Sequence, residues 1–191
     1  FSSEQAERFL LCANKIEEIT GYKFIKHLLN SAGVLRFPMY HFDMVRLGIG
    51  LFKTGINDQD NSMPVLKFRT YISQIRKIKA GEGIGYGLKD VKGYERQIAI
   101  IPLGYADGLR RMLGQGRGEV YIMQTRVPIV GNICMDMCMI DVTGLGVTEG
   151  EELEIFGENI SVAEIARKCN TIPYEIITGI PPRVKRIYLY E

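Results

Sequence analysis

The sequence has few of the residues that usually build metal centres, and it lacks the long apolar segments that cross membranes. Of its 191 residues, two are histidine and four are cysteine. No apolar run approaches the roughly 18 residues of a membrane span, and no signal-peptide pattern opens the chain. We therefore expect a soluble cytoplasmic protein that holds no metal and contacts no membrane.

The chain also lacks a strong charge of either sign. Its formal net charge is +2, and acidic and basic residues are interspersed, which excludes an acidic tail. A basic cluster between Lys67 and Lys79 has no aromatic stacking motif beside it, so we expect a solvated strand face and no nucleic-acid partner. The 46% apolar content suffices for a core in one domain or one and a half.

The four cysteines do not form an evident pair. Cys134 and Cys138 lie in the run 133–142, whose length and alternation predict a strand, and four strand residues span roughly 13 Å. That separation is too large for a disulfide or for two ligands of one ion. Cys12 and Cys169 are remote in the sequence, so we expect free thiols.

The first part of the chain alternates predicted helices and strands. Ser2 to Gln5 has the spacing of a capping box, and apolar residues then recur at helical intervals until Gly21. Two apolar strands follow, with a short helical turn between them, and this order is typical of a parallel βα architecture. The strands are predicted at 24–29 and 44–51, and the turn at 34–37.

Two βα units cannot bury both faces of a parallel strand pair. We therefore expect residues 1–54 to be the tail of a larger domain whose beginning is missing, which fits a chain that starts at Phe1. Residues 55–64 are polar and rich in turn formers, and they are the expected linker.

Residues 65–191 show short apolar segments separated by glycines, which predicts an antiparallel barrel or sandwich. One helix interrupts them, with Ser161 as its N-cap and Glu164 completing a capping box. Its inner face is formed by Val162, Ile165, Ala166 and Cys169. The expected strands are 68–72, 97–103, 119–123, 127–130, 133–142, 151–156 and 184–190. The fold class is thus α+β, with a mostly antiparallel second domain.

The run Gly83-Ile84-Gly85-Tyr86-Gly87 holds a tyrosine among three glycines. Glycines permit positive φ and close backbone approach, so this spacing presents one phenol at a bend. Taken alone, the run favours a strand end with a surface tyrosine, because glycine-rich turns are common. It matches neither the dinucleotide fingerprint nor the P-loop.

Two features of the first part suggest a bound group. Arg46 stands in an apolar strand, where it needs a partner such as a carboxylate, a phosphate or a ring nitrogen, unless it reaches solvent at the strand end. Asn30-Ser31 offers a hydroxyl and backbone N–H groups at a strand-to-helix turn, which suits a phosphate or an ordinary helix cap.

Two loops of the second part are candidates for a site. An apolar strand near 100–103 leads into a polar loop with Tyr105, Asp107 and Arg110, a concentration that favours a site over a plain turn. Asp136 interrupts another apolar run, either as a solvated side chain or as a placed anion.

The order of these motifs closely resembles the carboxyl-terminal half of bacterial alanine racemase, a fold-type III family. The resemblance covers nearly all of residues 24–188. The matching strings are His27-x-x-Asn-Ser-Ala32, Phe42-Asp-Met-Val-Arg-x-Gly-Ile49, Gly85-Tyr-Gly87, Ile101-Pro-x-Gly-Tyr-Ala-Asp-Gly108, Pro128-Ile-Val-Gly-x-Ile-Cys-Met-Asp136 and Thr178-Gly-x-x-Pro-Arg-Val184.

The resemblance implies a (β/α)₈ barrel that carries pyridoxal 5′-phosphate (PLP), followed by a mostly β domain. Two chains form a homodimer in which each active site joins the barrel of one chain to the β domain of the other. Cofactor-binding roles would fall to four residues near the phosphate, and alanine would be the substrate. Those four are Asn30, Ser31, Gly48 and Ile49.

Further roles follow from the same resemblance. Arg46 would hydrogen-bond the pyridine nitrogen with support from His27, and Tyr86 would be one of two catalytic bases on opposite faces of the substrate. Residues of the two later loops would contact phosphate or substrate, or shape access to the site. Tyr105 and the backbone of Met135 would contact phosphate or substrate. Asp136 and Arg110 would shape access to the site.

Two departures limit what the resemblance implies. The family's cofactor-binding lysine lies in a motif near the start of the barrel that is absent here, so we expect this chain to be inactive alone. Asn132 stands where the family often has an arginine, and Pro182 where some members have a tyrosine, and both bear on substrate access. A racemase of another small amino acid such as serine, or a non-catalytic β-barrel interaction module, are the alternatives.

Overall fold

The computed structural model describes residues 1–52 and 64–189 of the chain. It divides the chain into two compact units, Phe1–Ser62 and Met63–Glu191. Apart from Pro64, the expected linker 55–64 lies outside the described residues. Along the described residues, no helix combines the length and apolar character needed to cross a bilayer.

The first unit opens with helix α1 (Ser2–Thr20), as the sequence predicts. Gly21 ends it in the left-handed conformation at φ 67°, and its N–H donates to Glu17 O. The expected capping box at Ser2 is wrong, because the helix already includes Ser2 and no side chain caps its start.

Residues 26–29 and 43–46 run parallel, as expected, but they form only a short pairing. A single bridge joins His27 and Met44, and Arg46 N donates to Leu29 O at 3.0 Å. The predicted strand 44–51 is wrong beyond this point, because Ile49–Phe52 is a 3₁₀ helix, η2. Parallel strands need flanking strands and helices, and the described unit supplies few. Its other elements are α2 (Ser31–Arg36) and η1 (Pro38–Tyr40).

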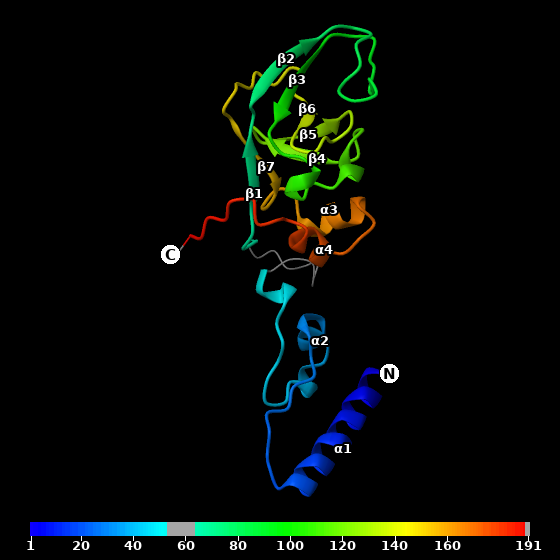
Figure 1. Ribbon diagram of the computed structural model, residues 1–191, viewed down its shortest axis with the longest axis vertical. Helices are drawn as coiled ribbons and strands as arrows, with labels where there is room; N and C mark the ends of the chain where they lie inside the picture. Colours follow the sequence, from blue (N-terminus) through cyan, green and yellow to red (C-terminus); the bar gives the residue numbers. More distant parts are fainter. Residues whose placement is uncertain (53–63, 190–191) are drawn as a thin grey trace. The chain divides into compact units, whose positions relative to one another are not determined.

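The second unit is built on one curved antiparallel sheet of seven strands in the order β1-β7-β4-β5-β6-β3-β2 (Figure 1). This confirms the predicted α+β class with a mostly antiparallel second part. The strands are β1 (Phe68–Tyr71), β2 (Gln74–Ile78), β3 (Arg96–Ile101), β4 (Glu119–Ile122), β5 (Thr125–Val130), β6 (Cys138–Asp141) and β7 (Glu152–Phe156).

The central strands bury side chains on both faces of the sheet, because successive strand residues point in opposite directions. In β3, Ala99 and Ile101 join the main core, while Ile98 joins a smaller cluster with Val130 and Met139. Ile84, from the turn that carries Tyr86, completes that smaller cluster. The sheet therefore gives this turn an apolar platform.

Helices α3 (Val162–Lys168) and α4 (Pro173–Thr178) pack together and contribute to the main core. Ser161 caps α3 through a hydrogen bond from Glu164 N, as predicted. The Glu164 carboxylate, however, accepts from Arg126 at 2.9 Å. The remaining short elements are 3₁₀ helices η3 (Tyr105–Asp107) and η4 (Arg111–Leu113).

Two predicted strands differ from the structure. The run 133–142 is a strand only over Cys138–Asp141, because Cys134 N donates to Met137 O and closes a turn. Residues 184–189 form no strand, and Arg186 instead donates to the carbonyls of Ile180 and Val184. Strand β2 and helix α4 were not predicted.

Candidate active site

Tyr86 lies at the tip of a tight turn, and its side chain is presented to solvent. Gly85 and Gly87 have φ values of 60° and 75°, and Leu88 N donates to Gly85 O at 3.1 Å. At Gly83, a Cβ atom would lie 2.5 Å from the carbonyl oxygen of Leu88, so only glycine fits. Tyr86 itself is 76% exposed. The glycines therefore build the bend that the sequence predicts.

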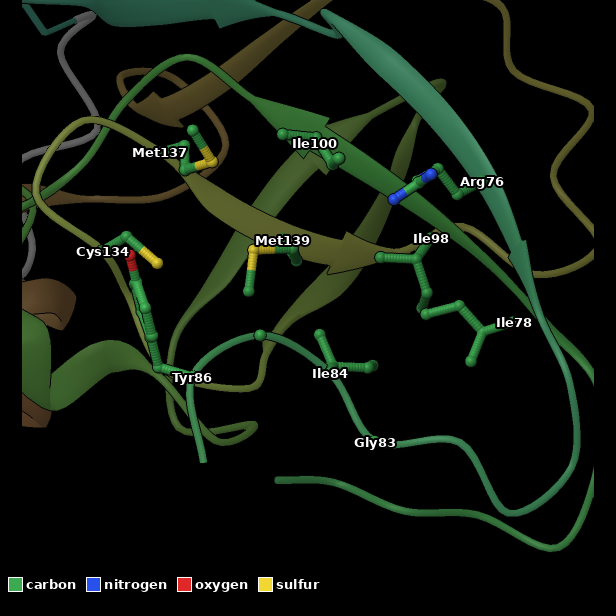
Figure 2. Close-up of a pocket in the computed structure, with 11 residues that line it drawn as sticks. Arg76, Ile78, Gly83, Ile84, Tyr86, Ile98, Ile100, Cys134, Met137 and Met139 are labelled. Atoms are coloured by element: carbon green, nitrogen blue, oxygen red, sulfur yellow. The ribbon is translucent and has the colours of Figure 1, made fainter. Parts of the chain in front are cut away.

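A cavity of about 480 Å³ opens beside this turn on the sheet (Figure 2). Tyr86 and Cys134 stand at one part of its lining, and Met137 and Met139 add thioethers from the loop before β6 and from β6 itself. Arg76 from β2 is the cation among the lining residues. The cavity thus places the phenol beside an apolar surface with one positive charge.

The loop after β3 is hydrogen-bonded to the loop before β6. Tyr105 N donates to Cys134 O and Ala106 N donates to Met135 O, both at 3.0 Å. Gly104 makes this possible, because a Cβ there would lie 2.2 Å from Met135 O. Tyr105 is 48% exposed and Met135 is 53% exposed. These two expected substrate residues therefore lie on one pair of hydrogen-bonded loops.

Arg183 joins the same two loops through their carboxylates. Its Nη2 lies 2.7 Å from Asp107 Oδ1 and 2.6 Å from Asp136 Oδ1. The hydrogen bond to Asp136, and then that to Asp107, raise the pKa of Arg183 further above its usual value. Asp136 is thus an exposed side chain that is also ion-paired, so it combines the two alternatives left open by its sequence. The motif around Arg183 was noted in the sequence, but its bridging role was not predicted.

Arg110 is paired with helix α4. Its Nη2 lies 2.6 Å from Glu175 Oε1. A hydrogen bond from Thr171, together with the charge of Arg110, lowers the pKa of Glu175. The expected role of Arg110 in shaping access to the site stays a prediction.

In the first unit, Ser31 is buried and forms the centre of a small polar cradle. Its Oγ accepts hydrogen bonds from Gly48 N at 2.8 Å and from Gly50 N at 3.2 Å. Asn30 caps α2 by accepting from Gly33 N at 2.9 Å. The predicted phosphate residues Asn30, Ser31 and Gly48 are therefore brought together, and buried Ile49 follows Gly48.

Arg46 and His27 lie close to this cradle in the chain. Arg46 is exposed, and its Nη2 donates to Leu28 O at 3.1 Å, so a backbone carbonyl rather than an acid is its partner. A cavity of about 290 Å³ is lined by Arg46 and Asn30 among others. His27 Nδ1 is buried without a hydrogen-bond partner among the described residues. The predicted support of Arg46 by His27 remains a prediction.

No group of three His, Cys, Asp or Glu side chains in the described parts of the chain could hold a metal ion. All four cysteines are free. Burial, and secondarily the neighbouring Cys134, raises the pKa of the Cys138 thiol well above its ordinary value.

Comparison with known proteins decides the family. The model of the alanine racemase C-terminal domain matches residues 65–188, and that of the N-terminal domain matches residues 1–55. The chain belongs to the alanine racemase family. Its expected resemblance is thereby confirmed.

The similarity to individual alanine racemases extends along nearly the whole chain. Alanine racemase 2 of Caldanaerobacter subterraneus subsp. tengcongensis is 38% identical, and the match covers 100% of this chain and 51% of that protein. The structure of the Clostridium difficile 630 enzyme is 32% identical with a TM-score of 0.88, covering 98% of this chain and 50% of the other.

A third similar structure is alanine racemase from Bartonella henselae with covalently bound pyridoxal phosphate. It is 33% identical with a TM-score of 0.79, and the match covers 88% of this chain and 48% of that one. The chain thus spans about half the length of the alanine racemases it matches.

Proposed function

We propose that this chain is the carboxyl-terminal segment of a PLP-dependent alanine racemase that interconverts L- and D-alanine. The observation that carries the proposal is the exposed Tyr86, held on a glycine turn beside the paired loops of Tyr105 and Met135. Family membership supports alanine as the substrate. D-alanine made in the cytoplasm would then supply peptidoglycan synthesis.

The residues of the first unit fit the phosphate of PLP. Ser31 Oγ already accepts two backbone N–H groups, so its own proton is available to donate to an anion. Similar backbone arrangements at helix starts bind phosphates in other proteins. We assign Ser31, Gly48 and Ile49 to the phosphate, with Asn30 beside them.

Arg46 is assigned to the ring nitrogen of the cofactor, and His27 to the support of Arg46. Arg46 donates one hydrogen bond to Leu28 O, and a guanidinium has five N–H groups, so donors remain for a ring nitrogen. Within the described parts of the chain, the buried Nδ1 of His27 has no hydrogen-bond partner, and it is the kind of polar atom that a bound group would satisfy. When bound, PLP supplies an electron sink that makes the α-proton of alanine acidic.

Tyr86 is assigned as one of the two bases. Racemisation removes the α-proton from one face of the substrate and returns a proton to the other, which requires a group on each face. The phenolic oxygen of Tyr86 would hold and release the proton on its face. Its exposure suits a residue that completes the site of a second copy in a homodimer.

Tyr105, Asp136 and the backbone of Met135 are assigned to binding. The phenol of Tyr105 and the N–H of Met135 can donate hydrogen bonds to a carboxylate or a phosphate. Arg183 keeps Asp136 paired, and Arg110, which is paired with Glu175, is assigned to shaping access to the site. These roles account for the polar loops that follow β3 and precede β6.

The chain alone should be inactive, because the lysine motif that anchors PLP in the family is absent from it. The test compares the chain with a full-length protein that carries it, using L-alanine, D-alanine and serine. The proposal predicts alanine racemisation only by the full-length protein, and a Tyr86→Phe variant slowed by roughly 10²–10⁴-fold. If the full-length protein prefers serine, serine replaces alanine as the substrate. If it has no racemase activity, the chain is better explained as part of an interaction module.

A further inference from the structure

Asn132 lies between Gln115 and the turn that carries Tyr86. Its Nδ2 donates to Tyr86 O at 2.8 Å, and its Oδ1 accepts from Gln115 Nε2 at 2.9 Å. Two side chains from distant parts of the sequence therefore form a bridge that ends on the backbone of Tyr86.

The direction of this bridge is fixed by its ends. The carbonyl oxygen of Tyr86 can only accept, so the amide of Asn132 must present its NH₂ group to it. The oxygen of Asn132 then faces Gln115, whose NH₂ group donates. Neither amide can be reversed without breaking a hydrogen bond.

The end of the bridge at Gln115 is held by a backbone hydrogen bond. Gln115 N donates to Gly131 O at 2.7 Å. Gly131 has φ 62°, and a Cβ at that position would lie 3.0 Å from Ile84 Cγ2 and 3.1 Å from Ile84 O. Gly131 thus lets residues 131–132 come close to the Tyr86 turn, while buried Ile84 fixes the base of that turn.

The carbonyl that Asn132 holds belongs to the central peptide of the turn. The bond from Leu88 N to Gly85 O, with φ 75° at Gly87, makes Tyr86 and Gly87 the two central residues of a type II turn. Glycine at the second central position adopts negative φ as readily, so this peptide can flip unless its carbonyl is held.

We propose that Asn132, oriented by Gln115, is a positioning residue for Tyr86. It holds the central peptide of the turn in one orientation and so keeps the phenol at a defined place. The catalytic consequence rests on the proposed function, whereas the effect on the turn does not. Asn132 stands where the family often has an arginine, and in this chain it donates a hydrogen bond to the turn that carries Tyr86.

The test uses a full-length protein that carries this chain, with Asn132→Asp as the main variant. The aspartate has the same shape but places an acceptor against Tyr86 O. The repulsion between this carboxylate and Tyr86 O should open the turn and break the bond from Leu88 N to Gly85 O more often. We therefore expect hydrogen exchange at the Leu88 amide to accelerate at least about tenfold at pH 7, with the amides of β3 unchanged. The value of kcat should fall roughly 10–100-fold and KM should change less than about threefold, because misplacement by about 1 Å has effects of this size.

Protonation provides an internal control. Below about pH 4 the introduced carboxyl carries a proton and can donate to Tyr86 O again. Relative to the unmodified protein at the same pH, exchange at Leu88 in Asn132→Asp should then slow towards a ratio of one, whereas Asn132→Ala should not recover. Asn14→Asp, at an exposed helix position, is the matched control for added charge.

Gln115→Glu tests the other end of the bridge and serves if Asn132→Asp does not fold. It should accelerate exchange at Leu88 by a smaller factor. Unchanged exchange at Leu88 and a kcat within twofold in both variants would overturn the role of Asn132. Full activity in Tyr86→Phe would instead overturn the proposed function, and the exchange measurements would still decide whether Asn132 holds the turn.

Discussion

Replacing Gly104 with alanine should separate the two loops that carry Tyr105 and Met135. A Cβ at Gly104 would lie 2.2 Å from Met135 O and 2.4 Å from Cys134 O. Carbon and oxygen atoms in contact stay roughly 3.2 Å or more apart, so the loops must move apart by about 1 Å. Both obstructing atoms belong to the backbone, and no side-chain rotation relieves the clash.

The cost follows from the hydrogen bonds between the loops. The bonds from Tyr105 N to Cys134 O and from Ala106 N to Met135 O are both 3.0 Å long, so a movement of about 1 Å breaks them. Each is worth about 1 kcal/mol. Overpacking in a closely packed region adds about 1–3 kcal/mol. We therefore expect Gly104→Ala to lower the free energy of unfolding by at least about 3 kcal/mol.

Urea unfolding of the chain, followed by circular dichroism of its β-sheet signal, measures this change. Gly93→Ala is the matched control, because no atom lies within 4 Å of a Cβ at that exposed position. It should leave stability unchanged or raise it slightly by restricting the unfolded chain. A loss below about 1 kcal/mol in Gly104→Ala would refute the close approach of the two loops.

Other consequences concern charges in the second unit. Arg183→Met leaves the carboxylates of Asp107 and Asp136 without their shared cation, so urea unfolding should show a small loss of stability, which Arg183→Lys reduces. In the α3 network, burial would raise the pKa of Glu164, but hydrogen bonds from Lys168 and Arg126 outweigh it and lower the pKa. The contribution of Glu164 to the free energy of unfolding is therefore complete above pH 4.5 and is lost as the pH falls through the lower folded pKa. Unfolding measured over this acid range should show that loss in the unmodified protein and not in a Glu164→Gln variant. Burial would lower the pKa of Lys168, but hydrogen bonds to Glu119 and Glu164 outweigh it and raise the pKa. The contribution of Lys168 to stability is therefore complete below pH 10.5 and is lost as the pH rises through the higher folded value. Lys168→Met should abolish that loss of stability at alkaline pH.

The second unit could be predicted from sequence where strands have apolar alternation and clear ends. The segments around β3, β4 and β7 were found because they bury residues on a packed sheet. Strand β2 is mostly exposed and gave no such signal. The run 133–142 alternates like a strand throughout, but the turn from Cys134 to Met137 depends on its pairing with the loop after β3.

The candidate site shows the same division. Ser31, Tyr86 and Tyr105 were identified from short motifs and from a family resemblance. The bridging of two loops by Arg183, and the link from Gln115 through Asn132 to Tyr86, join residues that are 17 to 76 positions apart. Sequence spacing cannot reveal such contacts, because only the folded sheet brings these loops together.

The most direct test of the central claim is solvent deuterium exchange at the α-carbon of each alanine enantiomer. The full-length protein carrying this chain should exchange the α-proton of both. Tyr86→Phe should lose exchange from one enantiomer and keep it with the other, because only one of the two bases is removed. Equal exchange of both enantiomers by Tyr86→Phe, at the rate of the unmodified protein, would contradict the role of Tyr86 as a base.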